Sequence, residues 1–248
     1  MSEVSVVGGR RAVVEAIRSG RVLDLMVASN VRETQGMRAV TNEAAAAGIT
    51  IRETDRHRLD LLAENHQGVV ARMRPDDERP AELGERDLSS FPFADDALVV
   101  VLDGISDPQN LGAAARTAEV AGAALMVTRV KRAADVTPAA IRASAGALLH
   151  LPHARVANIP RALERLKDAG FTVVGLHGEA SLGIYDEPCP GGRMAIVVGS
   201  EGAGLSRLVR ERCDLLVSLP MAGRIGSLNA SASLAAALYG YVLAPGRT

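Results

Sequence analysis

Several stretches of the chain are apolar at almost every position, and this constrains the fold more than any other feature. Residues 97 to 102 read ALVVVL, and residues 194 to 199 read MAIVVG. A strand that is apolar on both faces must be covered on both sides, as the strands of a parallel sheet are. Helix-like segments alternate with these runs, for example NLGAAARTAEVAG at 110 to 122. The pattern therefore predicts an α/β fold with a buried parallel sheet.

The chain divides into three parts by pattern. It has 248 residues, 48% of them hydrophobic, which is enough for one large domain or two small ones. Residues 1–75 alternate short helix-like and strand-like segments and predict a small α/β domain. Residues 76–96 are charged, contain proline and show no sustained periodicity, so we interpret them as a linker. Residues 97–248 then form the domain that contains the parallel sheet.

The charge is unevenly distributed along the chain. The net charge is −1, but the predicted linker alone has 8 acidic and 2 basic residues. Residues 1–75 have 11 basic and 9 acidic residues, and residues 97–248 have 15 and 12. Both predicted domains are thus slightly basic, which permits an RNA partner but does not by itself indicate one.

The sequence gives little support to a membrane protein, a secreted protein, a metalloprotein or a protein with a common phosphate-binding loop. No apolar run approaches the roughly 18 residues of a membrane-spanning helix, and the N-terminus lacks the layout of a signal peptide. We therefore expect a cytoplasmic protein without a membrane partner. Cys189 and Cys213 stand apart from each other and from histidine clusters, so we expect two buried thiols and no metal site. The segment GSEGAG has a GxxGxG spacing, which is neither of the common phosphate-binding patterns.

Three apolar strands end in turns that are rich in glycine and small polar residues. These junctions are LDGISDPQNLGAAAR at 102–116, VVGSEGAGL at 197–205 and LPMAGRIGSLNAS at 219–231. Ligands of open α/β sheets bind beyond the carboxyl ends of the strands, so we expect the three turns to form one site. Taken individually, each is also ordinary turn chemistry. In the third turn, Ser227 is placed to cap the helix that follows.

Longer segments around these junctions resemble, in order, the three motifs of the SpoU (TrmH) family of RNA ribose 2′-O-methyltransferases. They are DGISDPQNLGAAARTAEVAG at 103–122, IVVGSEGAGL at 196–205 and LPMAGRIGSLNASAS at 219–233. In addition, GGRRAVVEAIRSGRVLDLMVAS at 8–29 and NHQGVVARM at 65–73 are similar to the substrate-binding domain of one subfamily. That subfamily methylates a guanosine in 23S ribosomal RNA. The resemblance covers nearly the whole chain except the linker.

The resemblance implies a fold and an activity. It implies a parallel sheet with a C-terminal deep trefoil knot of the SPOUT type, preceded by a small α/β RNA-binding domain of the L7Ae/L30e type. It also implies an enzyme that transfers a methyl group from S-adenosyl-L-methionine (SAM) to a guanosine ribose of 23S rRNA. The knot would pack against a second copy in a homodimer, and no metal is required. A tRNA guanosine methyltransferase and a non-catalytic RNA-binding protein of the same fold are the alternatives.

The family motifs also assign residues to the site. Around the target nucleotide, they imply catalytic roles for Asn110, Arg116, Glu201, Ser227 and Asn229. Around the cofactor, they imply contacts from Gly199, Ser200, Leu219, Met221 and Leu228. The five polar residues implied at the nucleotide are all present, which argues against a non-catalytic relative.

Arg116 has two interpretations. The family casts it as the group that activates the ribose hydroxyl, but arginine has a pKa above about 12 and stays protonated in proteins. Alternatively, its charged guanidinium grips a phosphate and stabilises the developing alkoxide. Asn110 and Arg116 are six residues apart, so we expect both to approach the nucleotide only if the helix begins after Asn110.

Overall fold

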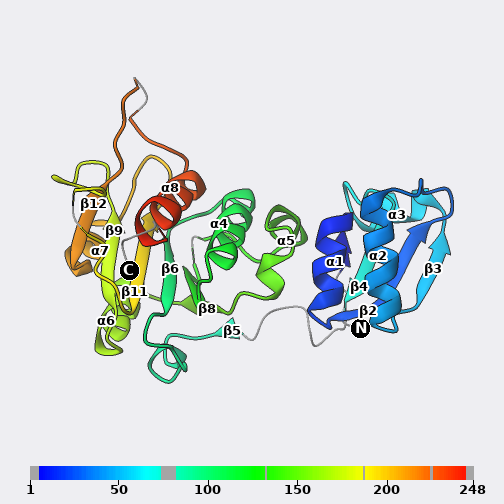
Figure 1. Ribbon diagram of the computed structural model, residues 1–248, viewed down its shortest axis with the longest axis horizontal. Coiled ribbons are helices and arrows are strands. Elements are labelled where there is room, and N and C mark those ends of the chain that lie inside the picture. Colours follow the sequence, from blue (N-terminus) through cyan, green and yellow to red (C-terminus); the bar gives the residue numbers. More distant parts are fainter. Residues whose placement is uncertain (1–5, 74–81, 132, 187, 224–225, 244–248) are drawn as a thin grey trace.

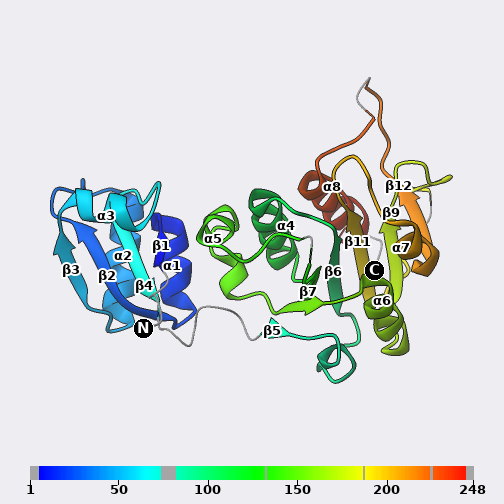
Figure 2. The ribbon, with the colours of Figure 1, turned by 180° about the vertical axis from the view of Figure 1, so that it is seen from behind.

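The protein consists of two α/β units that lie side by side along its longest axis (Figure 1, and from behind in Figure 2). The computed structural model describes residues 6–73, 82–131, 133–186, 188–223 and 226–243. The smaller unit is formed by residues 6–73, and the larger one by the described residues from 82 onward. The alternation of helix and strand expected for residues 1–75 is thus present in the part that is described.

The N-terminal unit contains a four-stranded sheet in the order β1-β4-β2-β3. β2 and β3 are parallel, and the other two pairs are antiparallel. Thr34 caps α2 by accepting a hydrogen bond from the Met37 N–H, and Asp55 caps α3 by accepting one from the His57 N–H. The elements of this unit are β1 (Val6–Gly8), α1 (Arg10–Arg18), β2 (Val22–Ala28), α2 (Gln35–Ala46), β3 (Ile51–Thr54), α3 (Arg56–Leu62) and β4 (Val69–Met73).

The C-terminal unit contains an eight-stranded sheet in the order β10-β12-β9-β11-β6-β7-β8-β5, and each of its described strand pairs is parallel. The predicted parallel sheet is confirmed. Its strands are β5 (Glu82–Leu83), β6 (Leu98–Asp103), β7 (Leu125–Arg129), β8 (His153–Val156), β9 (Thr172–Leu176), β10 (Leu182–Gly183), β11 (Met194–Gly199) and β12 (Leu215–Ser218).

Helices cover both faces of this sheet, which explains why its central strands are apolar throughout. Alternate residues of a strand point to opposite faces. In β6, Val100 and Leu102 belong to one buried cluster together with α4, α5 and α8, whereas Val99 and Val101 belong to a second cluster with α6 and α7. The helical segments are η2 (Asp87–Ser89), α4 (Pro108–Val120), α5 (Pro138–Ala143), η3 (Ala147–Leu149), α6 (Ile159–Asp168), α7 (Arg207–Arg212), α8 (Ala230–Ala237) and the π-helical turn η4 (Leu238–Val242).

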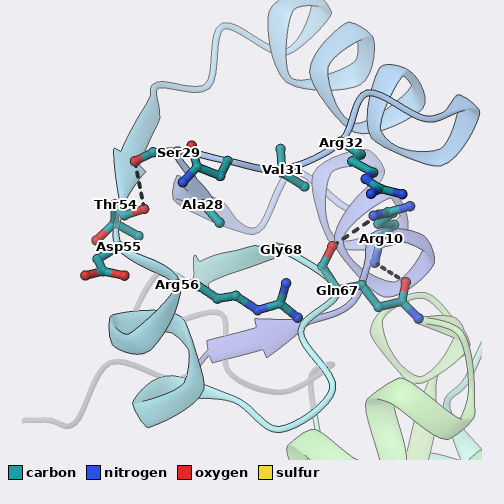
Figure 3. A pocket seen from close by; sticks show the side chains of 11 residues that line it. Arg10, Ala28, Ser29, Val31, Arg32, Thr54, Asp55, Arg56, Gln67 and Gly68 are labelled. Atoms are coloured by element: carbon teal, nitrogen blue, oxygen red, sulfur yellow. Dashed lines mark hydrogen bonds between the residues drawn. The ribbon is translucent and has the colours of Figure 1, made fainter.

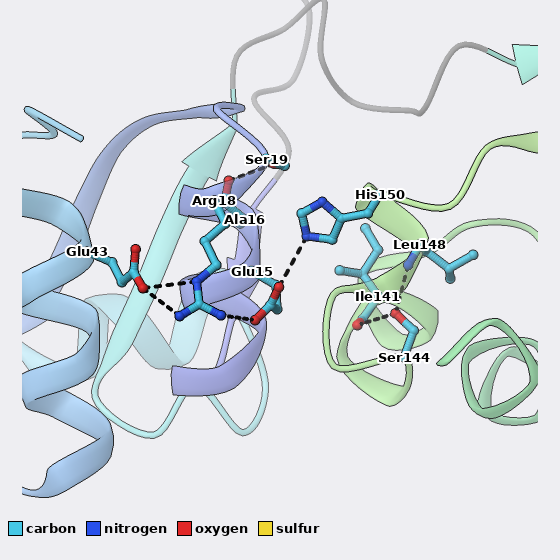
Figure 4. A network of polar contacts seen from close by, with 9 residues as sticks. All are labelled: Glu15, Ala16, Arg18, Ser19, Glu43, Ile141, Ser144, Leu148 and His150. Atoms are coloured by element: carbon cyan, nitrogen blue, oxygen red, sulfur yellow. Dashed lines mark hydrogen bonds and ion pairs between the residues drawn. The ribbon is translucent and has the colours of Figure 1, made fainter. Parts of the chain in front are cut away.

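The two units are in contact through α1 and β1 on one side and the α5–η3 region on the other. Glu15 of α1 lies 3.3 Å from the His150 imidazole and 3.1 Å from Arg18 (Figure 4). The backbone of Gly146 approaches closely, because a Cβ added there would lie 2.3 Å from the Glu15 Cβ. Gly146 also has a φ of 95°, in the region that favours glycine, and it lies immediately before η3.

The expectation that residues 76–96 form a linker is wrong for residues 82–96. β5 pairs with β8 and so becomes the edge strand of the large sheet. The Leu88 side chain is fully buried, and Phe93 packs edge-on against Phe171 with ring centroids 4.7 Å apart. The sequence pattern did not predict that this segment packs on the sheet, because its apolar residues are few and irregularly spaced among acidic ones. The remainder of the predicted linker, up to residue 81, lies outside the described residues.

Arg193 holds this segment against the C-terminal unit. Its guanidinium donates hydrogen bonds to the backbone carbonyls of Phe93 (2.8 Å), Ala94 (3.0 Å) and Ala169 (2.8 Å). Five N–H donors in a fixed plane make arginine able to serve three carbonyls at once. One side chain thus joins the segment that precedes β6 to the turn between α6 and β9.

Arg193→Ala should lower the free energy of unfolding by about 2 kcal/mol, because it leaves three carbonyls without their charged donor. Arg207→Ala is the control, since the one partner of Arg207 among the described residues is Glu211, in an exposed pair, and its loss should cost less than about 0.5 kcal/mol. Urea unfolding followed by circular dichroism measures both. Equal effects of the two substitutions would contradict the role assigned to Arg193.

Candidate active site

The carboxyl ends of β6, β11 and β12 bring the three polar turns to one edge of the large sheet. β6 and β11 are neighbours, and their last residues, Asp103 and Gly199, are paired in register. β9 lies between β11 and β12. The carboxylate of Asp103 is buried and accepts a hydrogen bond from the Ser206 N–H at 2.9 Å, which ties the first turn to the second.

Three of the five predicted catalytic residues form a closed triangle of hydrogen bonds. Glu201 Oε1 accepts hydrogen bonds from Asn110 Nδ2 at 2.8 Å and from Asn229 Nδ2 at 2.7 Å. Asn229 Nδ2 also donates to Asn110 Oδ1 at 2.8 Å. Asn110 comes from α4, Glu201 from the turn after β11 and Asn229 from the start of α8, and all three are exposed or half-exposed. The triangle is therefore a fixed polar surface that a ligand can reach.

Asn229 also begins helix α8. Its Oδ1 accepts hydrogen bonds from the Ser231 N–H at 2.8 Å and the Ala232 N–H at 3.4 Å, as an N-cap residue does. The interpretation of Ser227 as the helix cap is therefore wrong. One amide thus has two functions: its oxygen holds the helix, and its NH₂ group holds the triangle.

Helix α4 begins earlier than expected. Asp107 is its N-cap and accepts a hydrogen bond from the Gln109 N–H at 3.1 Å, and Pro108 occupies the first turn. Asn110 is therefore inside the helix, so the condition under which both Asn110 and Arg116 were expected to approach the nucleotide, a helix start after Asn110, is not met. Six residues span about 1.7 helical turns, so the side chains of Asn110 and Arg116 leave the helix on different faces.

Arg116 consequently lies apart from the triangle in this chain. It is exposed and lines a cavity of about 630 Å³ between the two units, together with Arg10, Arg11 and His150. No hydrogen bond or ion pair joins its guanidinium to any residue in the described ranges. Its charge is available to a ligand in that cavity.

A separate cavity of about 370 Å³ opens beside the triangle. Its volume falls in the range of small-molecule sites. Leucine and methionine side chains, the glycine-rich turn and Glu201 line it. The lining includes every predicted cofactor residue and Ser227: Gly199, Ser200, Leu219, Met221, Ser227 and Leu228.

Close backbone contact shapes the turn after β11. A Cβ added to Gly199 would lie 2.0 Å from the Gly204 carbonyl carbon, so no larger residue fits without moving the turn. Gly202 and Gly204 have φ values of 79° and 64°, which side chains disfavour. Glycine is thus required here so that Glu201 can project from a tight loop.

Sequence analysis missed the part of the cavity formed by the turn after β9 and by α7. His177 and Glu179 come from that turn, and Arg210 comes from α7. Arg210 Nη1 lies 3.2 Å from His177 Nε2, which must be the acceptor because arginine only donates. The segment FTVVGLHGE ends in a polar turn like the other three, so this signal was present for His177. α7 gave none.

The residues that the structure describes offer neither a cluster of metal ligands nor a reactive thiol at this site. Within the described ranges, no group of three or more His, Cys, Asp or Glu side chains could hold a metal ion. Cys189 and Cys213 are both free and half-buried, where full burial was expected. Desolvation and the charge of Asp214 raise the pKa of the Cys213 thiol to about 12, so it is a poor nucleophile at neutral pH. Nor does any helix in these ranges have the length and apolarity needed to cross a membrane.

Comparison with known families gives two matches along the chain. Residues 97–239 match the SpoU rRNA Methylase family, and residues 6–78 match the substrate-binding domain of RNA 2′-O ribose methyltransferases. An uncharacterized tRNA/rRNA methyltransferase of Mycolicibacterium vanbaalenii is 42% identical over 92% of this chain and 73% of its own. The 23S rRNA (guanosine-2′-O-)-methyltransferase RlmB of Photobacterium profundum is 38% identical over 88% of both chains.

Solved structures agree with these matches. A crystal structure of an RNA 2′-O ribose methyltransferase has a TM-score of 0.77 and 27% identity, over 94% of this chain and 86% of the other. The SpoU methyltransferase AviRb from Streptomyces viridochromogenes, in complex with AdoMet, has a TM-score of 0.72 and 28% identity, over 94% and 87%. Because the family match covers residues 97–239, more than half of the chain, and relatives of 38 to 42% identity span both units, this chain belongs to the SpoU family of RNA methyltransferases.

Proposed function

We propose that the protein transfers a methyl group from SAM to the ribose 2′-hydroxyl of a guanosine in 23S rRNA. The observation that carries this proposal is the Asn110–Glu201–Asn229 triangle beside the 370 Å³ cavity. The named 23S rRNA methyltransferase relative supports the choice of substrate. Its similarity extends over both units and is not limited to the one with the cavity.

The cavity beside the triangle fits SAM. Leu219, Met221 and Leu228 offer apolar surface for a flat base, whereas the turn at Gly199 and Ser200 offers backbone groups for polar contacts. The AviRb relative carries the same cofactor in its solved structure. SAM supplies an electrophilic methyl group. The residues of this chain have to present the ribose oxygen to it and dispose of a proton.

The triangle is suited to orient the ribose. Among the described residues, only the Oε1 atom of Glu201 has hydrogen-bond partners, so its Oε2 can accept a hydrogen bond from a hydroxyl. Ser227 lines the same cavity and adds a hydroxyl group. Since Asn110 and Asn229 fix the carboxylate from two sides, these groups are already positioned when the nucleotide arrives. Such positioning supplies much of the acceleration of a bimolecular transfer.

Arg116 acts on the RNA and not on the cofactor in this proposal, because it lines the cavity between the units. Two roles are consistent with that position. As a charge clamp it binds phosphate and stabilises the developing alkoxide. As a proton acceptor it would need to lose a proton that arginine holds strongly.

A knotted C-terminal part and a homodimer complete the proposal. β12 pairs with β9 and not with β11, while α8 returns to pack on α4 and β11. A chain that passes a loop formed earlier would give this arrangement, which supports the knot. Two exposed apolar side chains in and directly after η4 support a second copy packed there: Tyr239 and Leu243.

Asn229→Ser should separate the two functions of Asn229. Serine also caps helices, so stability should stay within about 0.5 kcal/mol of the unmodified protein, but it cannot bridge Asn110 and Glu201. Methylation should fall by about 10²-fold. Asn229→Ala should lose the same activity and, in addition, about 1 kcal/mol of stability. Thermal unfolding and single-turnover methylation measure the two effects, and full activity in the serine variant would exclude the triangle from catalysis.

Substitutions of Arg116 should change methylation but leave SAM affinity unaltered, because the two cavities are separate. If Arg116 is a charge clamp, Arg116→Lys should keep part of the activity with an unchanged pH–rate profile. Arg116→Ala should lose roughly 2.7 to 4 kcal/mol of transition-state stabilisation. A lysine variant as inactive as the alanine variant would favour the proton acceptor, and weakened SAM binding by calorimetry would contradict the separation.

Mapping of ribose methylation in cells lacking the gene tests the substrate. One guanosine of 23S rRNA should lose its 2′-O-methyl group and regain it when the gene is restored. Restoration with the Asn229→Ser gene should fail, which serves as the control for catalysis. Loss of a methyl group from tRNA instead would replace the proposed substrate, and no loss in either RNA would favour a non-catalytic protein.

A further inference from the structure

A second large cavity lies in the N-terminal unit, away from the cofactor cavity. It has a volume of about 870 Å³ and sits where the parallel strands β2 and β3 end (Figure 3). The carboxyl edge of parallel strands is the usual place for ligands in α/β sheets. Its lining combines apolar, amide and hydroxyl groups, from Ala28, Val31, Asn30, Gln67, Ser29 and Thr54.

Three arginines from separate elements border this cavity: Arg10 in α1, Arg32 after β2 and Arg56 in α3 (Figure 3). Neither Arg32 nor Arg56 has a hydrogen bond or ion pair with any residue that the structure describes. Asp55 is the one acidic residue in the lining, and its Oδ1 already accepts a hydrogen bond from the His57 N–H. The cavity therefore offers uncompensated positive charge.

The wall opposite β2 is a strained turn that is held in place. Asn65 and Gln67 have φ values of 54° and 53°, in the left-handed region that most residues avoid. Between them, the buried imidazole of His66 accepts the Gly68 N–H at Nδ1 (2.9 Å), and its Nε2 lies 2.9 Å from Asp60 Oδ1. Strain that the surroundings maintain in this way tends to occur at functional sites. Here it fixes the Gln67 side chain at the cavity.

Arg10 connects this cavity to the cavity of about 630 Å³ between the two units, which we call the cleft. Its Nη1 donates to Thr34 Oγ1 at 2.7 Å and its Nε to the Gln67 carbonyl at 3.2 Å, so its charge is held at a defined place. Arg10 lines both cavities, and Arg11 and Arg116 line the cleft. The cleft also contains Glu119 and Glu15, of which Glu15 is engaged by Arg18 and His150 (Figure 4).

We infer that the N-terminal cavity holds an unpaired nucleotide of the substrate RNA and that the same strand continues over Arg10 and Arg11 to Arg116. This inference rests on the proposed function and adds the path of the strand. A concave cavity with amide and hydroxyl groups suits a base that is turned out of a helix, whereas a duplex would need a broader surface. Arginines spaced along the path contact the phosphates on either side of the base.

Charge reversal at the cavity tests the nucleotide site. The Arg32→Glu/Arg56→Glu double variant should bind an unmodified 23S rRNA transcript at least about tenfold more weakly, with a smaller dependence of affinity on salt. The matched control is Arg38→Glu/Arg58→Glu, on α2 and α3 but outside the cavity lining. Because both double variants change the charge equally, equal losses of affinity would overturn the site.

The path and the type of RNA are tested separately. Arg11 lines the cleft but not the N-terminal cavity. Arg11→Glu should therefore weaken binding of the transcript severalfold more than the control Arg58→Glu does. Equal affinities of these two variants would overturn the continuous path. Single-stranded RNA should compete with the transcript better than duplex RNA of the same sequence, and the reverse order would overturn an unpaired nucleotide. SAM binding and residual methylation, measured on the same variants, separate a failure of this inference from a failure of the proposed function.

Discussion

Parallel pairing of β6 with β11 is the constraint on which the rest of the site depends. Both strands are buried on both faces, so their register is fixed by packing against helices on either side. That register puts Asp103 beside Gly199 and starts two polar turns from adjacent points. Because the turns are short and glycine-rich, Glu201 reaches back to Asn110 on α4. A register shift of one residue would move Asp103 out of its pairing with Gly199 and would displace the two turns relative to each other.

The first turns of helices α4 and α8 also position the polar groups of the site. Asp107 and Pro108 fix the first turn of α4, and Asn229 fixes that of α8. Since the triangle joins both helix starts to the turn after β11, the polar groups of the site are held by backbone geometry and do not depend on flexible side chains alone. This arrangement explains why small residues surround the site: larger ones would separate the three segments.

The two units contribute different groups to the cavities of the protein. The C-terminal unit contains the 370 Å³ cavity and the triangle, while the N-terminal unit contributes Arg10, Arg32 and Arg56 to its own cavity and Arg10 and Arg11 to the cavity between the units. Arg116 belongs to the C-terminal unit but faces the N-terminal one. In the proposed strand path, Arg116 is the point at which the RNA reaches the C-terminal unit.

The local pattern of the sequence determined the strands, the parallel sheet and the polar turns, because apolar runs and turn residues act over a few neighbours. The family motifs also identified Asn110, Glu201 and Asn229 as candidates. Tertiary structure alone decided which of them touch, since these contacts join residues 91 and 119 positions apart. It also attached residues 82–96 to the large sheet through Arg193, and it directed Arg116 away from the triangle, because the start of α4 sets the face from which each side chain leaves. These outcomes depend on contacts between segments that are far apart in the sequence, and the local periodicity of the sequence contains no information about such contacts.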